Sequence, residues 1–308
     1  MILVAGGTGM LGRALIPLLA SHDEPIRILT RGGRSGEPLD MPGVETVIGD
    51  VREPETLRRA MVGVRTVVSA INGFGGDGAL GVRAIDRDGN LNLIEAAESA
   101  GVEHFVLLSI QQAAGDHPIE LFRMKAAAEA RLRASTLSWT IVRPTAYQET
   151  WLEIVGRSLV TTGSTRVFGR GRNPINFVSA DDVARIVELA VVEPTLRAAT
   201  LDVSGPENLT FDGFVEVVRE ATGVTGTVNH VPLPMLRLMS IALRPFKPVI
   251  AGQIAAAVVM DTRDMTADTA ERARRFPGVA STPLADVAAR RLRSAIEPSA
   301  IHPSPARR

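Results

Sequence analysis

The N-terminal segment contains four closely spaced glycines, Gly6, Gly7, Gly9 and Gly12. They follow the strand-like residues 2–5 and fit the spacings G-x-G-x-x-G and G-x-x-G-x-x-G at once. Glycine suits such a turn because the chain bends sharply, the backbone approaches a pyrophosphate without a Cβ, and the following helix packs closely on the strand. The free N–H groups and the positive end of the helix dipole then face the phosphates. The pattern predicts a dinucleotide site, with a plain glycine turn as the alternative, and the expected contacts are Gly6, Thr8, Gly9, Met10, Leu11 and Gly12.

The residues after the second expected strand favour one dinucleotide over the other. NAD-binding sites usually carry an acidic residue here that holds the ribose 2′-hydroxyl. This chain has Arg31 and Arg34 instead, and its first acid is Glu37. A guanidinium suits a 2′-phosphate, to which it donates charge-assisted hydrogen bonds. We therefore expect NADP(H), with solvated loop charges as the alternative for both arginines.

Polar residues also follow the third and fourth expected strands, at the edge where such a cofactor would lie. Asp50 could accept a hydrogen bond from the adenine amino group, or could cap the next helix, and Val51 follows it. Asn72, two residues after Ala70, could contact ribose or phosphate, or could shape its glycine-rich loop. We include all four among the expected cofactor contacts.

The elements that would position these residues alternate along the chain. Apolar, β-branched runs predict strands at Ile2–Ala5, Ile26–Thr30, Glu45–Ile48, Thr66–Ala70, His104–Ser109 and Trp139–Val142. Helical patterns lie between them at Leu11–Ala20, Pro54–Met61, Arg83–Ala100 and Ile119–Ala134. Near-continuous apolar strands separated by helices predict an α/β fold with a doubly wound parallel Rossmann sheet.

After Val142 the pattern is looser. It predicts a strand and then a helix in Phe177–Val192, a strand at Thr200–Ser204, a helix at Phe211–Thr222 and one or two helices in Pro232–Met260. We expect residues 1–150 to form the cofactor-binding domain, to which elements near 176–204 return. Residues 151–296 would form a smaller substrate-binding lobe, and residues 297–308, which are rich in proline and polar residues, a disordered tail.

The composition excludes several classes of function. The 308 residues have a net charge of zero, which argues against nucleic-acid partners. There is no cysteine, and the five histidines lack metal-ligand spacing, so we expect no metal. The longest apolar run, Val249–Met260, is too short to span a bilayer, and we expect no membrane partner. No signal-peptide pattern begins the chain, which predicts a cytoplasmic protein.

Several stretches resemble a known family. GGTGMLGR, GDV, AGVEHFVLLS, WTIVRPTAY, NFVSADDVARIV and LDVSGPENLTF are similar to the atypical short-chain dehydrogenase/reductases, above all to the NmrA-like and isoflavone-reductase-like branch. The resemblance implies an active site in the cleft between a Rossmann domain and a smaller C-terminal part. It also implies that Pro144 and Thr145 form a nicotinamide-facing turn, and that Tyr147 lines the substrate pocket. A core position is the alternative for Tyr147.

The resemblance extends to the catalytic residues, with one departure. Family members commonly use Ser or Thr after the fifth strand and Tyr-x-x-x-Lys on the next helix. Ser109 and Lys125 match, but Leu121 occupies the tyrosine position, which argues against epimerases and ordinary alcohol dehydrogenases. The isoflavone-reductase branch often lacks that tyrosine and keeps Phe-x-x-Lys, as Phe122 and Lys125 do here. A surface lysine and a strand-capping serine are the alternatives.

Lys125 is one of only two lysines in the chain, beside Lys247. It could donate to the nicotinamide ribose, bind cofactor and assist proton transfer. Two functions follow from these observations. The first is an NADPH-dependent reductase of a small apolar, conjugated or aromatic substrate, whose pocket wall or lobe core would include Met235, Leu236, Leu238, Met239, Leu243 and Phe246. The second is a non-catalytic NADP(H) redox sensor that acts through a protein partner. A homo-oligomer is compatible with either function.

Overall fold

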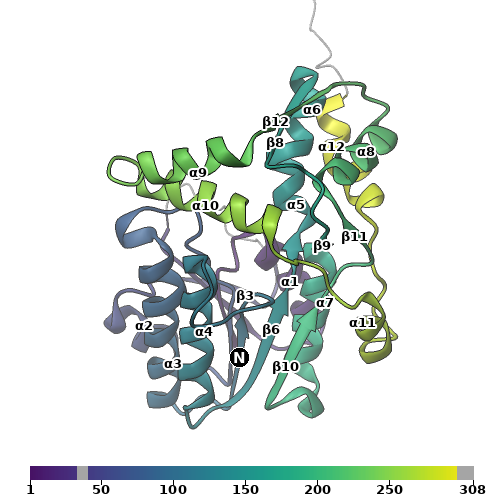
Figure 1. Ribbon diagram of the computed structural model, residues 1–308. Helices are drawn as coiled ribbons and strands as arrows, with labels where there is room; N and C mark the ends of the chain where they lie inside the picture. Colours follow the sequence, from purple (N-terminus) through teal and green to yellow (C-terminus); the bar gives the residue numbers. More distant parts are fainter. Residues whose placement is uncertain (33–40, 297–308) are drawn as a thin grey trace, which may run out of the picture.

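A seven-stranded parallel sheet forms the centre of the protein in the computed structural model, which describes residues 1–32 and 41–296 (Figure 1). Its strand order is β10-β6-β5-β4-β1-β2-β3, and every neighbouring pair is parallel. The strands are β1 (Ile2–Ala5), β2 (Ile26–Thr30), β3 (Val44–Ile48), β4 (Thr66–Ser69), β5 (His104–Leu108), β6 (Ser138–Pro144) and β10 (Ala199–Val203). The predicted doubly wound sheet is confirmed. Arg34 and the expected tail at 297–308 lie outside the described residues.

Helices cover both faces of this sheet, which is why its central strands are apolar throughout. One core cluster joins the sheet to α1 and α7, and a second joins the other face to α2, α3 and α4. These helices are α1 (Met10–Ala20), α2 (Pro54–Ala60), α3 (Asn90–Ser99), α4 (Glu120–Arg133) and α7 (Ala180–Val192). Because β10 pairs with β6 and α7 packs beside α1, residues 180–203 are part of this layer.

The predicted helix at Arg83–Ala100 is divided in two. Its first part, η2 (Arg83–Gly89), is π-helical, and α3 continues from it. The short 3-10 segment η1 (Gly78–Leu80) precedes it. A Cβ on Gly89 would lie 2.7 Å from Cγ2 of Val51, so glycine permits close packing at this junction. The wider turn places the carboxylate of Asp86 inside the protein, where Asp86 is fully buried.

The remaining elements form a smaller lobe beyond the carboxyl ends of the strands, into which β6 leads directly. The helical elements of the lobe are α5 (Gln148–Trp151), η3 (Leu152–Gly156), α6 (Arg157–Thr162), α8 (Phe211–Thr222), α9 (Leu233–Ala242), α10 (Pro248–Thr262), α11 (Thr269–Arg275) and α12 (Leu284–Ile296). The short 3-10 segment η4 (Pro194–Leu196) connects α7 to β10 and belongs to the sheet layer. The strands are β7 (Ala146–Tyr147), β8 (Ser164–Phe168), β9 (Ile175–Val178), β11 (Asn208–Leu209) and β12 (Thr227–Val231). A third core cluster joins η3, α6, α8 and α12.

Six apolar side chains between 235 and 246 were expected to line a pocket or fill a core, and the structure corrects this expectation. Only Leu236 is buried, and Leu243 is half-buried. The other four, Met235, Leu238, Met239 and Phe246, are exposed. The reason is that α9 packs on α10 through one side only. None of the described helices is long and apolar enough to cross a membrane.

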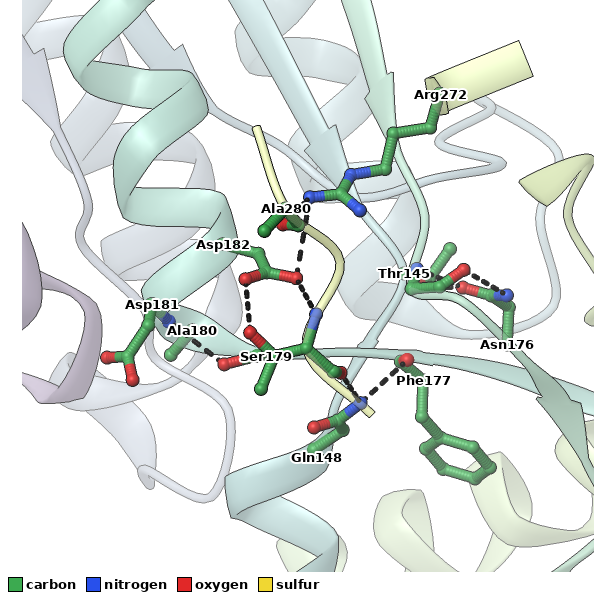
Figure 2. A network of polar contacts seen from close by, with 12 residues as sticks. Thr145, Gln148, Asn176, Phe177, Ser179, Ala180, Asp181, Asp182, Arg272 and Ala280 are labelled. Atoms are coloured by element: carbon green, nitrogen blue, oxygen red, sulfur yellow. Dashed lines mark hydrogen bonds and ion pairs between the residues drawn. The ribbon is translucent and has the colours of Figure 1, made fainter. Parts of the chain in front are cut away.

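A buried polar network fixes the last segment of the lobe to α7 (Figure 2). The Asp182 carboxylate accepts hydrogen bonds from the backbone N–H of Thr282 at 2.8 Å and from its hydroxyl at 2.6 Å. Arg272 lies 3.4 Å from the same carboxylate and donates to the Ala280 carbonyl. Gln148 bridges the carbonyls of Phe177 and Thr282. These contacts hold α11 and α12 against the sheet layer.

Candidate functional site

The glycine turn between β1 and α1 is closely packed at two positions. Gly6 has φ +88°, and a Cβ there would lie 2.6 Å from the Ala70 carbonyl oxygen. A Cβ on Gly12 would lie 2.5 Å from the carbonyl oxygen of Gly6. At Gly9, by contrast, a Cβ would meet only that same oxygen, at 3.3 Å. Gly6 and Gly12 are therefore required by the fold, whereas Gly9 is less crowded, and the expected pyrophosphate contact there stays a prediction.

The N-terminus of α1 is suited to an anion. Gly9 is its N-cap, no side chain among the described residues caps it, and its first turn contains no acid. In contrast, Ser179, Thr210 and Asp268 each cap a helix by accepting from backbone N–H groups. The first N–H groups of α1, from Met10 to Gly12, therefore remain available for phosphate oxygens. Thr8 and Met10 are half-buried beside this end, and Leu11 is buried.

Asp50 and Val51 follow β3, and Asp50 already has a partner. Arg52 forms a fork on its carboxylate, with Nε 2.9 Å from Oδ1 and Nη2 2.5 Å from Oδ2. These hydrogen bonds, a backbone N–H of Arg52 and the nearby charges of Arg52 and Arg31 hold the pKa of Asp50 below its usual range, against the effect of burial. Arg52 also donates to the Ala79 carbonyl, so it links β3 to the loop after β4. The adenine contact of Asp50 stays a prediction.

Sequence reasoning missed Arg52, although the spacing Asp-x-Arg was visible. Arg31 itself is exposed at the end of β2, where its side chain is accessible to a ligand. Val51 is buried against Gly89. The expected contacts at the third strand thus lie together at the carboxyl edge of the sheet.

The segment after β4 contains Ala70 and Asn72. The backbone N–H of Ala70 donates to Ala5, which places the two strand ends side by side. The Asn72 side chain is exposed, and its Oδ1 accepts from the backbone N–H of Phe74 at 2.7 Å. This contact is the loop-shaping alternative for Asn72, so its contact with a cofactor stays a prediction.

Lys125 is buried, with only 5% of its surface exposed, so the surface-lysine alternative is wrong. Its Nζ donates to the carbonyls of Ile71 at 3.1 Å and of Leu108 at 2.9 Å. It also lies 3.0 Å from Oδ1 of Asp86, in an ion pair outside hydrogen-bond geometry. The other oxygen of Asp86 accepts from the backbone N–H of Gly73 at 2.9 Å. Lys125 therefore joins the ends of β4 and β5 and retains one N–H for a further acceptor.

Asp86 was not foreseen in the sequence. One signal was available, because Asp86, Asn90, Leu93 and Ala97 share the spacing of a buried helical face. All four are buried. Asp86 also receives indirect support, since Asn90 donates to its backbone carbonyl and accepts from Ser69.

Ser109 is buried and its hydroxyl donates to Oε1 of Glu129 at 2.5 Å. Glu129 also pairs with Arg143 and Arg133. The hydroxyl proton of Ser109 is thus directed into an internal ionic network. The catalytic role of Ser109 stays a prediction. Its contact with Glu129 favours a structural role at the end of the strand, which was the alternative.

The turn after β6 is well fixed. Pro144 is buried, and the buried Thr145 donates its hydroxyl to Oδ1 of Asn176 at 2.9 Å. Tyr147 is half-buried and packs against the core shared by α1 and α7. Burial, with a smaller effect of Glu149, raises the pKa of Tyr147. Tyr147 is therefore a poor acid and does not replace the tyrosine missing at position 121.

The chain is similar to several known proteins. An NAD(P)H azoreductase from Xenophilus azovorans is 31% identical over 224 residues, which is 72% of this chain and 74% of that protein. The photosystem II assembly factor Ycf39 from Synechocystis sp. is 28% identical over 248 residues, 80% of this chain and 75% of that protein. The structure of NADPH-dependent quinone oxidoreductase QOR2 from Escherichia coli, complexed with NADPH, matches with a TM-score of 0.77 at 19% identity, and covers 95% of this chain and 100% of that one.

The family assignment follows from a match to a protein-family model. Residues 6–194, more than half of the chain, match a family described as NAD(P)H-binding. The prediction of a nicotinamide dinucleotide cofactor is thereby confirmed, as is the resemblance to atypical short-chain reductases. This chain belongs to the NAD(P)H-binding family.

Proposed function

We propose that the protein is an NADPH-dependent reductase of small, planar, conjugated or aromatic acceptors such as quinones and azo compounds. One observation carries the proposal: the expected catalytic side chains are either absent or already engaged by other protein groups. Leu121 stands at the tyrosine position. The charge of Lys125 is balanced by Asp86, and the proton of Ser109 is directed to Glu129.

This arrangement suits acceptors that need no proton from the enzyme. Hydride addition to an isolated carbonyl leaves a localised alkoxide, which requires a nearby acid. Hydride addition to a quinone leaves a hydroquinone anion whose charge is delocalised, and water can protonate it afterwards. When bound, NADPH supplies the hydride and its two electrons and leaves as NADP+.

The chain's own residues would bind and orient the cofactor. The α1 N-terminus would bind the pyrophosphate, and Arg31 would favour NADP(H) by pairing with a 2′-phosphate. The remaining N–H of Lys125 would donate to a cofactor hydroxyl, with its position fixed by Asp86. Proton transfer by Lys125 would require it to break one of its present contacts. An azoreductase and a quinone oxidoreductase among the similar proteins support this substrate class.

A redox sensor is the second candidate, because missing proton donors fit a non-catalytic protein equally well. The similarity to an assembly factor favours it. Such a protein would bind NADP+ and NADPH with clearly different affinities and pass the difference to a partner protein.

The test follows NADPH oxidation by absorbance with menadione, methyl red and benzaldehyde as acceptors. We expect the quinone menadione and the azo dye methyl red to be reduced, and the aldehyde benzaldehyde to remain unreduced. The Gly9→Asp variant is the control, because a carboxylate in the cradle repels phosphate. Tight NADPH binding without turnover of any acceptor would contradict the reductase and favour the sensor.

A further inference from the structure

The hairpin formed by α9, α10 and the turn between them carries several strongly exposed large apolar side chains, including the two most exposed of the described residues. Phe246 is 82% exposed, Ile241 72% and Leu238 68%. Figure 1 shows α9 on the outer side of α10, with the turn between them projecting at the left edge of the molecule. Burying such side chains is favourable, so an exposed group of them indicates a surface that is covered by something else.

These side chains share one face. By the helical step of about 100° per residue, Ile241, Leu238, Met235 and Met239 lie within an arc of roughly 160°. Leu236, the one buried residue of α9, lies outside that arc, on the side that packs on α10. The apolar face therefore points away from α10 and contributes nothing to the lobe core.

The charge of the hairpin is one-sided. Residues 232–260 contain three cations, Arg237, Arg244 and Lys247, and no acid. The one acid of α10, Asp261, is buried and pairs with Arg170. All three cations are exposed, and none of them forms an ion pair with a described residue. Two of them flank Phe246 in the turn. The zero net charge of the whole chain conceals this local excess.

We propose that the α9–α10 hairpin binds the surface of an anionic lipid bilayer. The apolar face would enter the boundary between headgroups and acyl chains, while the three cations would bind acidic headgroups. A projecting ridge of apolar side chains with cations beside it suits a deformable lipid surface.

A second copy of the chain fits less well. A two-fold contact through this face would bring each hairpin's cations close to those of its copy, and like charges in an interface are costly. The inference does not depend on the proposed reductase activity. The proposal replaces the expectation of no membrane partner. That expectation considered only segments that could span a bilayer and the net charge of the whole chain, not residues that bind its surface.

Flotation of the full chain with lipid vesicles tests the proposal. We expect binding to vesicles of equimolar phosphatidylglycerol and phosphatidylcholine, little binding to pure phosphatidylcholine, and release at high salt. The Arg244→Gln/Lys247→Gln variant should lower the partition coefficient roughly 30-fold, at about fivefold for each cation near the surface. Ile241→Ser/Phe246→Ser should lower it at least as far.

Ile48→Ser is the matched control, because Ile48 is 71% exposed but lies at the far edge strand β3. It should bind vesicles as the parent does, and all variants should keep the parent's melting temperature. Equal binding of all variants would overturn the proposal, as would absence of the parent from anionic vesicles. A concentration-dependent dimer that Ile241→Ser/Phe246→Ser abolishes, in a chain that does not bind vesicles, would assign the face to a second copy instead.

Discussion

The ammonium group of Lys125 lies 3.0 Å from a carboxylate oxygen of Asp86, and both side chains are buried. Two ions so far from water are stable only because each has further polar contacts. Asp86 also accepts from Gly73, and Lys125 donates to the carbonyls after β4 and at the end of β5. The pair therefore connects the π-helical turn, the glycine-rich loop and the sheet edge at the place where a nicotinamide cofactor is expected.

Removing one member of this pair leaves the other charged and unpartnered. Lys125→Met should lower the free energy of unfolding by about 3–5 kcal/mol in urea titrations at neutral pH. The double variant Asp86→Asn/Lys125→Met should recover part of that loss. Lys247→Met, an exposed control, should change stability by less than about 0.5 kcal/mol. A Lys125→Met protein as stable as the parent would show that the pair is not structural.

Gly9 and Gly12 should respond in opposite ways. Gly9→Asp places a good N-cap residue at α1, and its Cβ would lie 3.3 Å from the Gly6 carbonyl oxygen. The N-cap preference of Asp over Gly and this close contact oppose each other, so the free energy of unfolding should change by only a few tenths of a kcal/mol. NADPH binding, measured by nicotinamide fluorescence, should nevertheless be lost, because the carboxylate occupies and repels the phosphate position. Gly12→Ala should instead lower the melting temperature, since its Cβ would lie 2.5 Å from backbone atoms. Undiminished NADPH binding by Gly9→Asp would place the cofactor elsewhere.

Arg31→Ala should weaken the binding of NADPH much more than the binding of NADH. Loss of a charge-assisted bond, worth about 1.5–3 kcal/mol, predicts roughly 10- to 150-fold weaker NADPH binding. NADH lacks the 2′-phosphate, so its dissociation constant should change less than about twofold, by the same argument. Parallel titrations with both cofactors measure the ratio. If both affinities fell equally, Arg31 would not read the phosphate.

His104 should make stability depend on pH. It is fully buried on β5, where its Nε2 contacts the Thr140 hydroxyl. Thr140 donates its own proton to the Leu196 carbonyl, so His104 Nε2 is the donor in this pair. Burial, with a smaller effect of the Arg197 charge, lowers the pKa of His104 from 6.5 to about 4.

The unfolded chain binds a proton at His104 below pH 6.5, whereas the folded chain does so only near pH 4. The contribution of His104 to the free energy of unfolding is therefore fully present above pH 6.5. It is lost as the pH falls from 6.5 to 4, which lowers the free energy of unfolding by about 3 kcal/mol. Urea titrations across the window should show a shallower loss for His104→Gln than for the parent. Identical slopes for parent and His104→Gln would exclude the buried histidine as the cause.

Local patterns were sufficient for the sheet and for the cofactor turn. These features depend on residues that are neighbours in the chain: apolar strands of the parallel type, helical periodicities and the four glycines. The predicted boundaries of strands and helices therefore differ from those of the structure by only a few residues. The arginine after β2 was visible for the same reason. The π-helical turn at Arg83–Gly89 was not, because its sequence fits a regular helix and the wider turn is set by packing against Val51.

The sequence by itself determined the fold class, the dinucleotide family and the absence of a tyrosine at position 121. Only the tertiary structure decided which charges are paired and which apolar residues are covered. Lys125 pairs with Asp86, and Ser109 donates to Glu129, and no sequence pattern predicts either contact between residues so far apart in the chain. Met235 and Leu238 are as apolar as core residues, yet they remain outside because α9 has a neighbour on only one side. Burial is a property of how elements pack, which single residue types do not specify.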